Sequence, residues 1–241
     1  MKQMITYEEE DPDLKATYLW HNSRCLHRQT THRGTLLEMI DRPVWGLTCY
    51  MDGIIQSCDI DQDLYHTTLV NSAFRYFFRN SNARVCILGG GEGATAKKVL
   101  EQTNIAKVDM IEWDRDVLDM FQYKFPTWGK DVWDDERLTV YEEDAFNADR
   151  RRRSYHIVIA DLFDFTMEES DDWIVFLRRI GRWTKYCLTL YVGTHAPFLR
   201  TGDPVLRKIR RALQEIGFKT HLSSVYIPSF HGFAVFLTGV R

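Results

Sequence analysis

V-C-I-L-G-G-G-E-G-A, residues 85–94, decides the fold, because an apolar run of four residues leads directly into a glycine turn. Short apolar runs bounded by glycines are typical of buried strands, and the residues after the turn favour a helix. A strand, a glycine turn and a helix in this order form the usual nucleotide-like binding place of an α/β sheet. Glu92 is the unusual member of the turn, since a carboxylate there suits a cation and repels a phosphate.

Strands alternate with helices from Arg84 to the C-terminus. The sequence predicts strands at 85–88, 108–112, 138–141, 156–160 and 186–192, and helices at 94–102, 114–124, 172–182 and 203–216. Two late runs, 219–227 and 232–238, predict a closing hairpin. Alternation of this kind predicts an α/β fold of Rossmann-like, methyltransferase type, with a mostly parallel twisted sheet and helices on both faces.

The region before this alternation has no helical period until residue 61. Apolar, β-favouring segments at 36–40, 45–51 and 54–56 predict a small antiparallel β unit, and Asp52-Gly53 predicts the hairpin between the last two. An amphipathic helix is predicted over 61–79. We therefore expect a small N-terminal β unit at residues 1–60 and a Rossmann-like catalytic domain at residues 61–241.

Composition limits the function classes. The 241 residues carry a formal charge of −3 from 31 basic and 34 acidic residues, so nothing predicts binding to nucleic acid or to an anionic membrane. The five cysteines form no C-x-x-C pair, which favours reduced thiols in a cytoplasmic protein. The start reads as no secretory signal, and no apolar stretch is long enough to cross a bilayer. The arginine run 150–153 predicts a solvated turn, with an anion site as the alternative.

Acidic residues stand at or just beyond the ends of the first four predicted parallel strands: Glu92, Glu112, Asp144, and the pair Asp161 and Asp164. Ligands of parallel sheets bind beyond the carboxyl ends of the strands, so these acids are expected around one cleft. Turn formation and helix capping are the alternative explanation for each single acid.

Glu112 stands at the offset of about twenty residues expected for an acid that binds ribose hydroxyls. Gly89, Gly91 and Ala94 also satisfy the dinucleotide pattern, but a pyrophosphate on this loop would face Glu92. At about 4 Å and an effective dielectric constant of about 20, that repulsion costs about 4 kcal/mol. The charge of Glu92 therefore favours a sulfonium such as S-adenosylmethionine or its decarboxylated form. A helix N-terminal acid that points to solvent is the alternative.

Asp161 and Asp164 follow the fourth strand, where a partly desolvated carboxylate could accept a proton from an ammonium group or hold a polycation. Tyr65, Tyr226 and Phe230 fall in segments that flank the expected cleft. The histidines lack metal spacing, and a magnesium site built from the acids would lack recognisable ligand spacing, so no metal is expected.

These residues resemble the polyamine aminopropyltransferases, the family of spermidine, spermine and thermospermine synthases, from about Thr35 to the C-terminus. Six segments carry the resemblance in order: Y-M-D-G-I-I-Q (50–56), D-L-Y-H (63–66), G-G-G-E-G-A-T-A (89–96), Glu112 with Asp144-Ala145, D-L-F-D (161–164), and I-P-S-F (227–230).

The resemblance implies aminopropyl transfer from decarboxylated S-adenosylmethionine to putrescine or spermidine, with release of methylthioadenosine. It implies Asp161 as the general base, with Asp164 and Tyr65 as further catalytic residues. The implied cofactor-binding residues are Gly89, Gly90, Gly91, Glu92, Gly93, Glu112, Asp144, Ala145 and Gln56. The implied amine-binding residues are Gln56, Tyr65, His66, Glu92, Asp161, Asp164, Tyr226 and Phe230. A homodimer is also implied.

Three other function classes stay open from the sequence. An S-adenosylmethionine-dependent methyltransferase of a small amine would release S-adenosylhomocysteine, although Glu92 would repel the carboxylate of that cofactor. A non-catalytic protein that binds a nucleoside or polyamine would bind methylthioadenosine without turnover. A dinucleotide enzyme is the remaining alternative.

Overall fold

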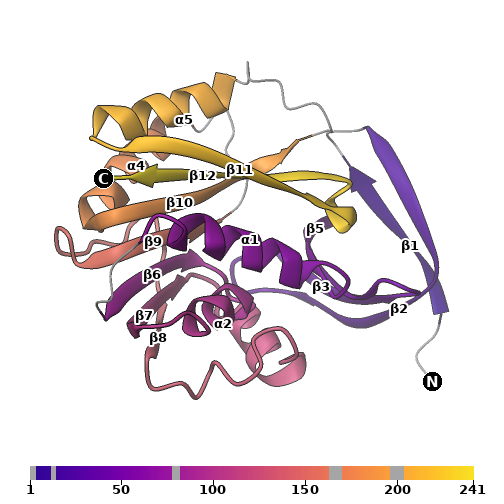
Figure 1. The fold of residues 1–241 in the computed structure, drawn as a ribbon. Helices are drawn as coiled ribbons and strands as arrows, with labels where there is room; N and C mark the ends of the chain where they lie inside the picture. Colours follow the sequence, from indigo (N-terminus) through magenta and orange to yellow (C-terminus); the bar gives the residue numbers. More distant parts are fainter. Residues whose placement is uncertain (1–3, 12–14, 78–81, 163–169, 196–203) are drawn as a thin grey trace.

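The computed structural model describes residues 4–11, 15–77, 82–162, 170–195 and 204–241, which form two sheets (Figure 1). The first is a five-stranded antiparallel meander in chain order. Its strands are β1 Met4–Asp11, β2 Ala16–Thr30, β3 Leu36–Arg42, β4 Gly46–Met51 and β5 Ile54–Cys58. Asp52 and Gly53 join β4 to β5 with positive φ angles of 52° and 78°, as a two-residue hairpin of this type requires.

The antiparallel N-terminal unit is confirmed, and it is larger than predicted. The three predicted strands correspond to β3, β4 and β5, whereas β1 and the 15-residue β2 were not predicted. The predicted boundary near residue 60 falls between β5 and the first helix; as a division into two domains it stays a prediction.

A cluster of buried side chains around one ion pair joins four strands of this N-terminal sheet. The Arg42 guanidinium donates to the Glu9 carboxylate at 2.9 Å, and both side chains are almost fully buried. Trp20 and Tyr50 also donate to Glu9, at 2.6 and 2.8 Å, and the indole of Trp20 lies 4.2 Å from the guanidinium carbon of Arg42. These contacts satisfy a charge that would otherwise be costly to bury.

The second sheet has seven strands in the order β11-β12-β10-β9-β6-β7-β8. Strands β8, β7, β6, β9 and β10 are parallel, and β12 and β11 close the edge as an antiparallel hairpin. The bounds are β6 Ala83–Gly89, β7 Ile105–Glu112, β8 Leu138–Glu142, β9 Tyr155–Asp161, β10 Thr184–His195, β11 Lys219–Ile227 and β12 Gly232–Val240. The predicted α/β class is confirmed.

Helices cover both faces of this sheet (Figure 1). Helix α1 (Gln62–Phe74) and α2 (Ala94–Leu100) pack together on one face, and α4 (Ser170–Trp183) and α5 (Pro204–Glu215) pack on the other. Helix α3 (Arg115–Asp119) follows β7 and continues as the π-helix η1 (Met120–Lys124), while the 3₁₀ turn η2 (Pro228–Phe230) precedes β12. In the described part of the chain, no helix is both long and apolar enough to cross a membrane.

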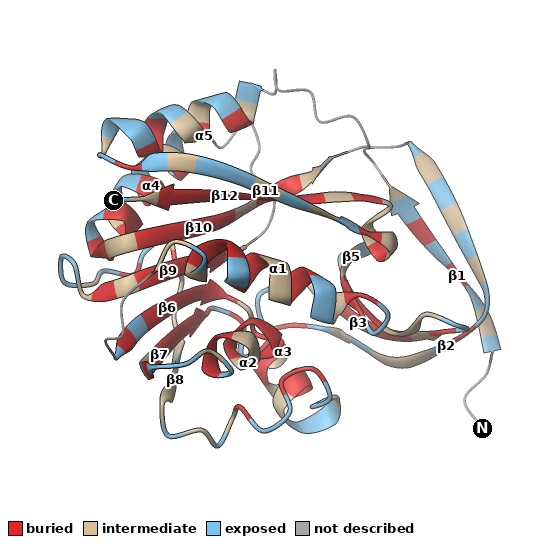
Figure 2. Ribbon diagram, viewed as in Figure 1, coloured by how far each residue is buried: buried red, intermediate tan, exposed pale blue. Residues whose placement is uncertain are grey.

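Strand β6 shows why the sheet needs helices on both sides. Val85 and Ile87 belong to the apolar cluster under α1 and α2, whereas Cys86 and Leu88 belong to the cluster under α4 and α5. All four side chains are fully buried, and Figure 2 shows the same burial along the central strands. A strand buried on both faces reads as a continuous apolar run, as residues 85–88 do.

The chain reverses its direction of sheet growth between β6 and β9. From β6 it adds β7 and β8 on one side, and it then crosses over to add β9 and β10 on the other. The carboxyl ends of β6 and β9 therefore stand side by side at a topological switch point, where ligands of open α/β sheets bind.

Candidate active site

The glycine turn after β6 is in close contact with the end of β9. Gly89 pairs with Asp161 across the two parallel strands and has a φ of 79°. A Cβ atom on residue 89 would lie 2.1 Å from the carbonyl oxygen of Asp161, so only glycine fits there. Asp161 is the last residue of β9, whereas the sequence placed it on the following loop.

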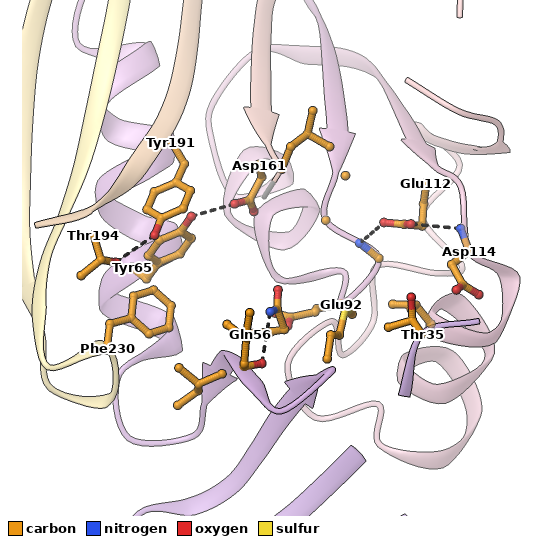
Figure 3. Close-up of a pocket in the computed structure, with 18 of the residues that line it drawn as sticks. Thr35, Gln56, Tyr65, Glu92, Glu112, Asp114, Asp161, Tyr191, Thr194 and Phe230 are labelled. Atoms are coloured by element: carbon orange, nitrogen blue, oxygen red, sulfur yellow. Dashed lines mark hydrogen bonds between the residues drawn. The ribbon is translucent and has the colours of Figure 1, made fainter. Parts of the chain in front are cut away.

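Glu112 ends the neighbouring strand β7 and turns its carboxylate toward the same loop (Figure 3). Its Oε2 accepts the Gly91 N–H at 3.1 Å, and its Oε1 accepts the N–H groups of Trp113 and Asp114 at 2.8 and 3.1 Å. A Cβ on residue 91 would meet the Glu112 side chain at 3.0 Å, so the glycine permits this approach.

Burial raises the pKa of Glu112 to about 7, although the three backbone N–H groups oppose that rise. Oε2 accepts only one N–H, so it keeps acceptor capacity for a ligand hydroxyl. The site therefore offers a carboxylate that changes its charge near neutral pH.

The Asp161 carboxylate is fixed by hydroxyl donors from two helices. Tyr65 of α1 donates to Oδ1 at 2.8 Å, and Thr95 of α2 donates to Oδ2 at 2.6 Å (Figure 3 draws the first of these bonds). The carboxylate is still about one tenth exposed. Both oxygens are oriented, and the group remains accessible from the pocket.

His66 lies between Asp161 and Glu92 and contacts Thr95. Because the single Thr95 hydroxyl proton points to Asp161, the 2.8 Å contact with Nδ1 of His66 requires Nδ1 to carry the hydrogen. Nε2 of His66 lies 3.5 Å from Oε2 of Glu92, and the buried Nε2 has no hydrogen bond. The other oxygen of Glu92 accepts from Ser57 at 2.5 Å. The hydrogen bonds thus run from Asp161 through Thr95 to His66, and Glu92 is held separately by Ser57.

Tyr65, His66, Glu92, Glu112 and Asp161 line one pocket of about 650 Å³, whereas Ser57 and Thr95 support it from behind. The predicted residues that line it are Gln56, Tyr65, His66, Gly89, Gly90, Gly91, Glu92, Glu112, Asp144, Ala145, Asp161 and Phe230. Asp144 also caps the turn after β8, because its carboxylate accepts from the Phe146 N–H at 2.8 Å and the Asn147 amide at 2.6 Å. Acids at or just beyond the carboxyl ends of four strands thus meet at one site.

Three predicted site residues are not placed in this pocket. Tyr226 is 46% exposed and packs its ring on Phe233, because the alternation of β11 turns residue 226 away from the cleft. Gly93 begins α2 and faces the side chain of Trp133. Asp164 lies outside the described residues.

Several lining or supporting residues were not predicted as site residues. Ser57 and Thr95 hold the two acids from behind, and Tyr191 and Thr194 line the far side and contact each other at 2.8 Å (Figure 3). The hydroxyl residues carry no pattern of their own in the sequence. Among the described residues, no group of three or more histidine, cysteine or acidic side chains is arranged to hold a metal ion.

The sequence of this chain is similar to that of proteins of known function. Residues 62–239 match the family described as the spermine/spermidine synthase domain. Over 224 residues the chain is 34% identical to the polyamine aminopropyltransferase of Pyrobaculum aerophilum. This match covers 89% of this chain and 74% of that protein. Polyamine aminopropyltransferase 1 of Hyperthermus butylicus is 37% identical over 124 residues, covering 50% of this chain and 42% of that protein; the match thus spans less than half of that relative.

A solved spermidine synthase, crystallised with the transition state analogue AdoDATO, has the same fold. The TM-score is 0.82 at 20% sequence identity, over 99% of this chain and 81% of that one.

Proposed function

The chain belongs to the spermine/spermidine synthase family, and we propose that it transfers an aminopropyl group from decarboxylated S-adenosylmethionine to a di- or polyamine. Methylthioadenosine would be released. The observation that carries this proposal is Asp161, a carboxylate oriented by Tyr65 and Thr95 in the same pocket as the glycine turn and Glu112. The curated relatives named above are polyamine aminopropyltransferases.

In this proposal the β6–β8 side of the pocket binds the nucleoside. Glu112 accepts hydrogen bonds from the ribose hydroxyls, and Asp144 and Ala145 bind the adenine. Gly89 to Gly91 have no side chains, so the ligand can lie close to their backbone. The carboxylate of Glu92 attracts the sulfonium, which has the opposite charge. A phosphate in this place would be repelled.

The β9–β10 side binds the amine. Asp161 accepts a proton from the attacking nitrogen, which needs its lone pair free to form the new C–N bond as the C–S bond breaks. Tyr65 keeps the carboxylate in position, and Gln56, His66 and Phe230 border the path of the polyamine chain. Glu92 supplies negative charge for the ammonium groups. The proposed parts of Asp164 and Tyr226 in amine binding stay predictions from the resemblance.

The test is methylthioadenosine formation, measured by liquid chromatography, with decarboxylated S-adenosylmethionine and either putrescine or spermidine. We expect Asp161→Asn to lower the rate by at least about 100-fold, the lower range for general acid–base catalysis. Asp149→Asn, at an exposed position outside the pocket, is the matched control and should keep the wild-type rate.

Absence of methylthioadenosine with every amine offered would refute the transferase proposal. Release of S-adenosylhomocysteine from intact S-adenosylmethionine would instead support a methyltransferase. Binding of methylthioadenosine without turnover would support a non-catalytic protein.

We also propose that the chain forms a homodimer through its N-terminal unit, as its resemblance to the family implies. Light scattering after size-exclusion chromatography measures the mass directly. A mass equal to that of one chain, 28.4 kDa, across the concentration range would contradict it.

A further inference from the structure

A second hollow lies at the other end of the large sheet's strands from the main pocket, on the side where the C-terminus is marked in Figure 1. Its volume is about 390 Å³, and it lies between the loop before β9, the end of α4, the α5–β11 turn and the end of β12. Six residues line it: Arg152, Arg153, Arg182, Ile216, Gly217 and Arg241. Four of the six are arginines contributed by three separate parts of the chain.

These four guanidinium groups have no acidic partner among the described residues. The nearby acids are engaged elsewhere, since Glu143 pairs with Arg150 at 2.6 Å and Glu215 pairs with Arg178 and Arg211 at 3.3 and 3.1 Å. The arginine run was predicted to be a solvated turn. Arg151, Arg152 and Arg153 are exposed, as that prediction requires, whereas Arg150 is half-buried and paired with Glu143; Arg151 lies outside the hollow.

The helix ends at this edge do not neutralise the hollow. Helices α4 and α5 end here, and each helix end contributes about half a negative charge. Together they offset only about one of the four arginine charges, so the hollow keeps an excess of positive charge.

Arg241 is held in place by the protein itself. Its guanidinium donates to the carbonyl oxygens of Thr184 at 2.5 Å and Ile216 at 3.3 Å and lies 4.1 Å from the ring centre of Phe218. Burial and then the charges of Arg153 and Arg152 lower the pKa of Arg241, so the positive groups are close enough to repel one another. An anion between them would relieve that repulsion.

We propose that this hollow binds a small multivalent phosphate anion, of the size of inorganic phosphate or a diphosphate group, independently of the main pocket. Arginine forks match the oxygens of phosphate with two parallel hydrogen bonds, and the excess of positive charge favours a multivalent phosphate over a singly charged carboxylate. The volume admits a diphosphate group.

The test is a calorimetric titration of the full chain with sodium pyrophosphate, in a low-salt buffer without phosphate, because exposed charges are screened at high salt. The Arg152→Gln/Arg153→Gln variant should raise the dissociation constant at least about tenfold, since each lost charge-assisted hydrogen bond is worth about that factor or more. Arg151→Gln removes the same charge from the same loop but outside the hollow, and it should change the constant less than about twofold.

A second variant, Arg182→Gln, places the same test on α4 and should also weaken binding. An acetate titration should give no saturable heat, and adenosine diphosphate beside pyrophosphate distinguishes a phosphate carried on a nucleoside from a free anion. Absence of saturable pyrophosphate binding to the wild type, or equal weakening by Arg151→Gln and the double variant, would overturn the proposal.

Methylthioadenosine serves as the control ligand for the main pocket. Its affinity should be the same in all these variants, which also reports that they fold. Should methylthioadenosine fail to bind even to the wild type while pyrophosphate binds, the proposed transferase function fails and the anion site stands.

Discussion

Binding of methylthioadenosine should strengthen as the pH rises from 6 to 8, because in our proposal the ionised carboxylate of Glu112 accepts the hydrogen bond of a ribose hydroxyl. The pKa of this buried carboxyl is about 7 in the ligand-free pocket. About one tenth of the groups are ionised at pH 6 and about nine tenths at pH 8. If the nucleoside binds only the ionised form, the dissociation constant at pH 6 is about tenfold higher, equal to about 1.4 kcal/mol.

Isothermal titration of the wild type and of Glu112→Gln at pH 6, 7 and 8 measures this dependence. The glutamine variant should bind weakly and should show no change with pH, because its side chain does not titrate. Methylthioadenosine carries no sulfonium, so the charges of Glu92 and Asp161 bear little on its affinity. A wild-type dissociation constant that stays within about twofold from pH 6 to 8 would refute the role given to Glu112, as would the same pH dependence in Glu112→Gln.

Three further changes test other parts of the structure. Thr95→Val keeps the shape of a buried side chain but removes one of the two hydroxyl donors to Asp161. The kcat for aminopropyl transfer should therefore fall by about 10- to 100-fold, with KM changed less than about threefold. An unchanged kcat would contradict the role of this bond. Gly89→Ala forces the new Cβ against the Asp161 carbonyl oxygen. Gly34 is the control, because it has a φ of 91° but open space around it, so Gly34→Ala should lower the free energy of unfolding by about 1 kcal/mol. Urea unfolding should show a larger loss for Gly89→Ala, and equal losses would mean that the close approach is tolerated. Arg42→Met leaves the buried carboxylate of β1 unpaired and should lower the free energy of unfolding by about 3–5 kcal/mol, and a loss below about 1 kcal/mol would contradict the charge pairing described.

The parallel sheet could be predicted because its central strands are buried on both faces and therefore read as continuous apolar runs. Strand β2 could not, because its mostly exposed and half-exposed residues include many polar side chains and give no clean alternation. Arg42 is a similar case: a fully buried arginine is satisfied only by partners from other strands, which the local sequence does not reveal.

The acids around the pocket could be predicted because the carboxyl ends of parallel strands meet at one edge. Their supporting groups could not, because a serine or threonine hydroxyl has no periodicity and finds its partner through the tertiary fold. Thr95 and Asp161 are 66 residues apart, and Ser57 and Glu92 are 35 apart. Tyr226 was assigned to the cleft from its position in the chain, and only the register of β11 decides on which side its ring lies.

The bond between Tyr65 and Asp161 joins residues 96 positions apart in the chain. Contacts of such long range form late when a chain folds, because the entropy cost of closing a large loop comes before the contact can stabilise the chain. The contacts of Glu112 with Gly91, Trp113 and Asp114 need only β6, β7 and the turns that follow them. During refolding, the half of the pocket that we propose binds the nucleoside should therefore become competent before the half that holds Asp161, and recovery of methylthioadenosine binding should precede recovery of turnover.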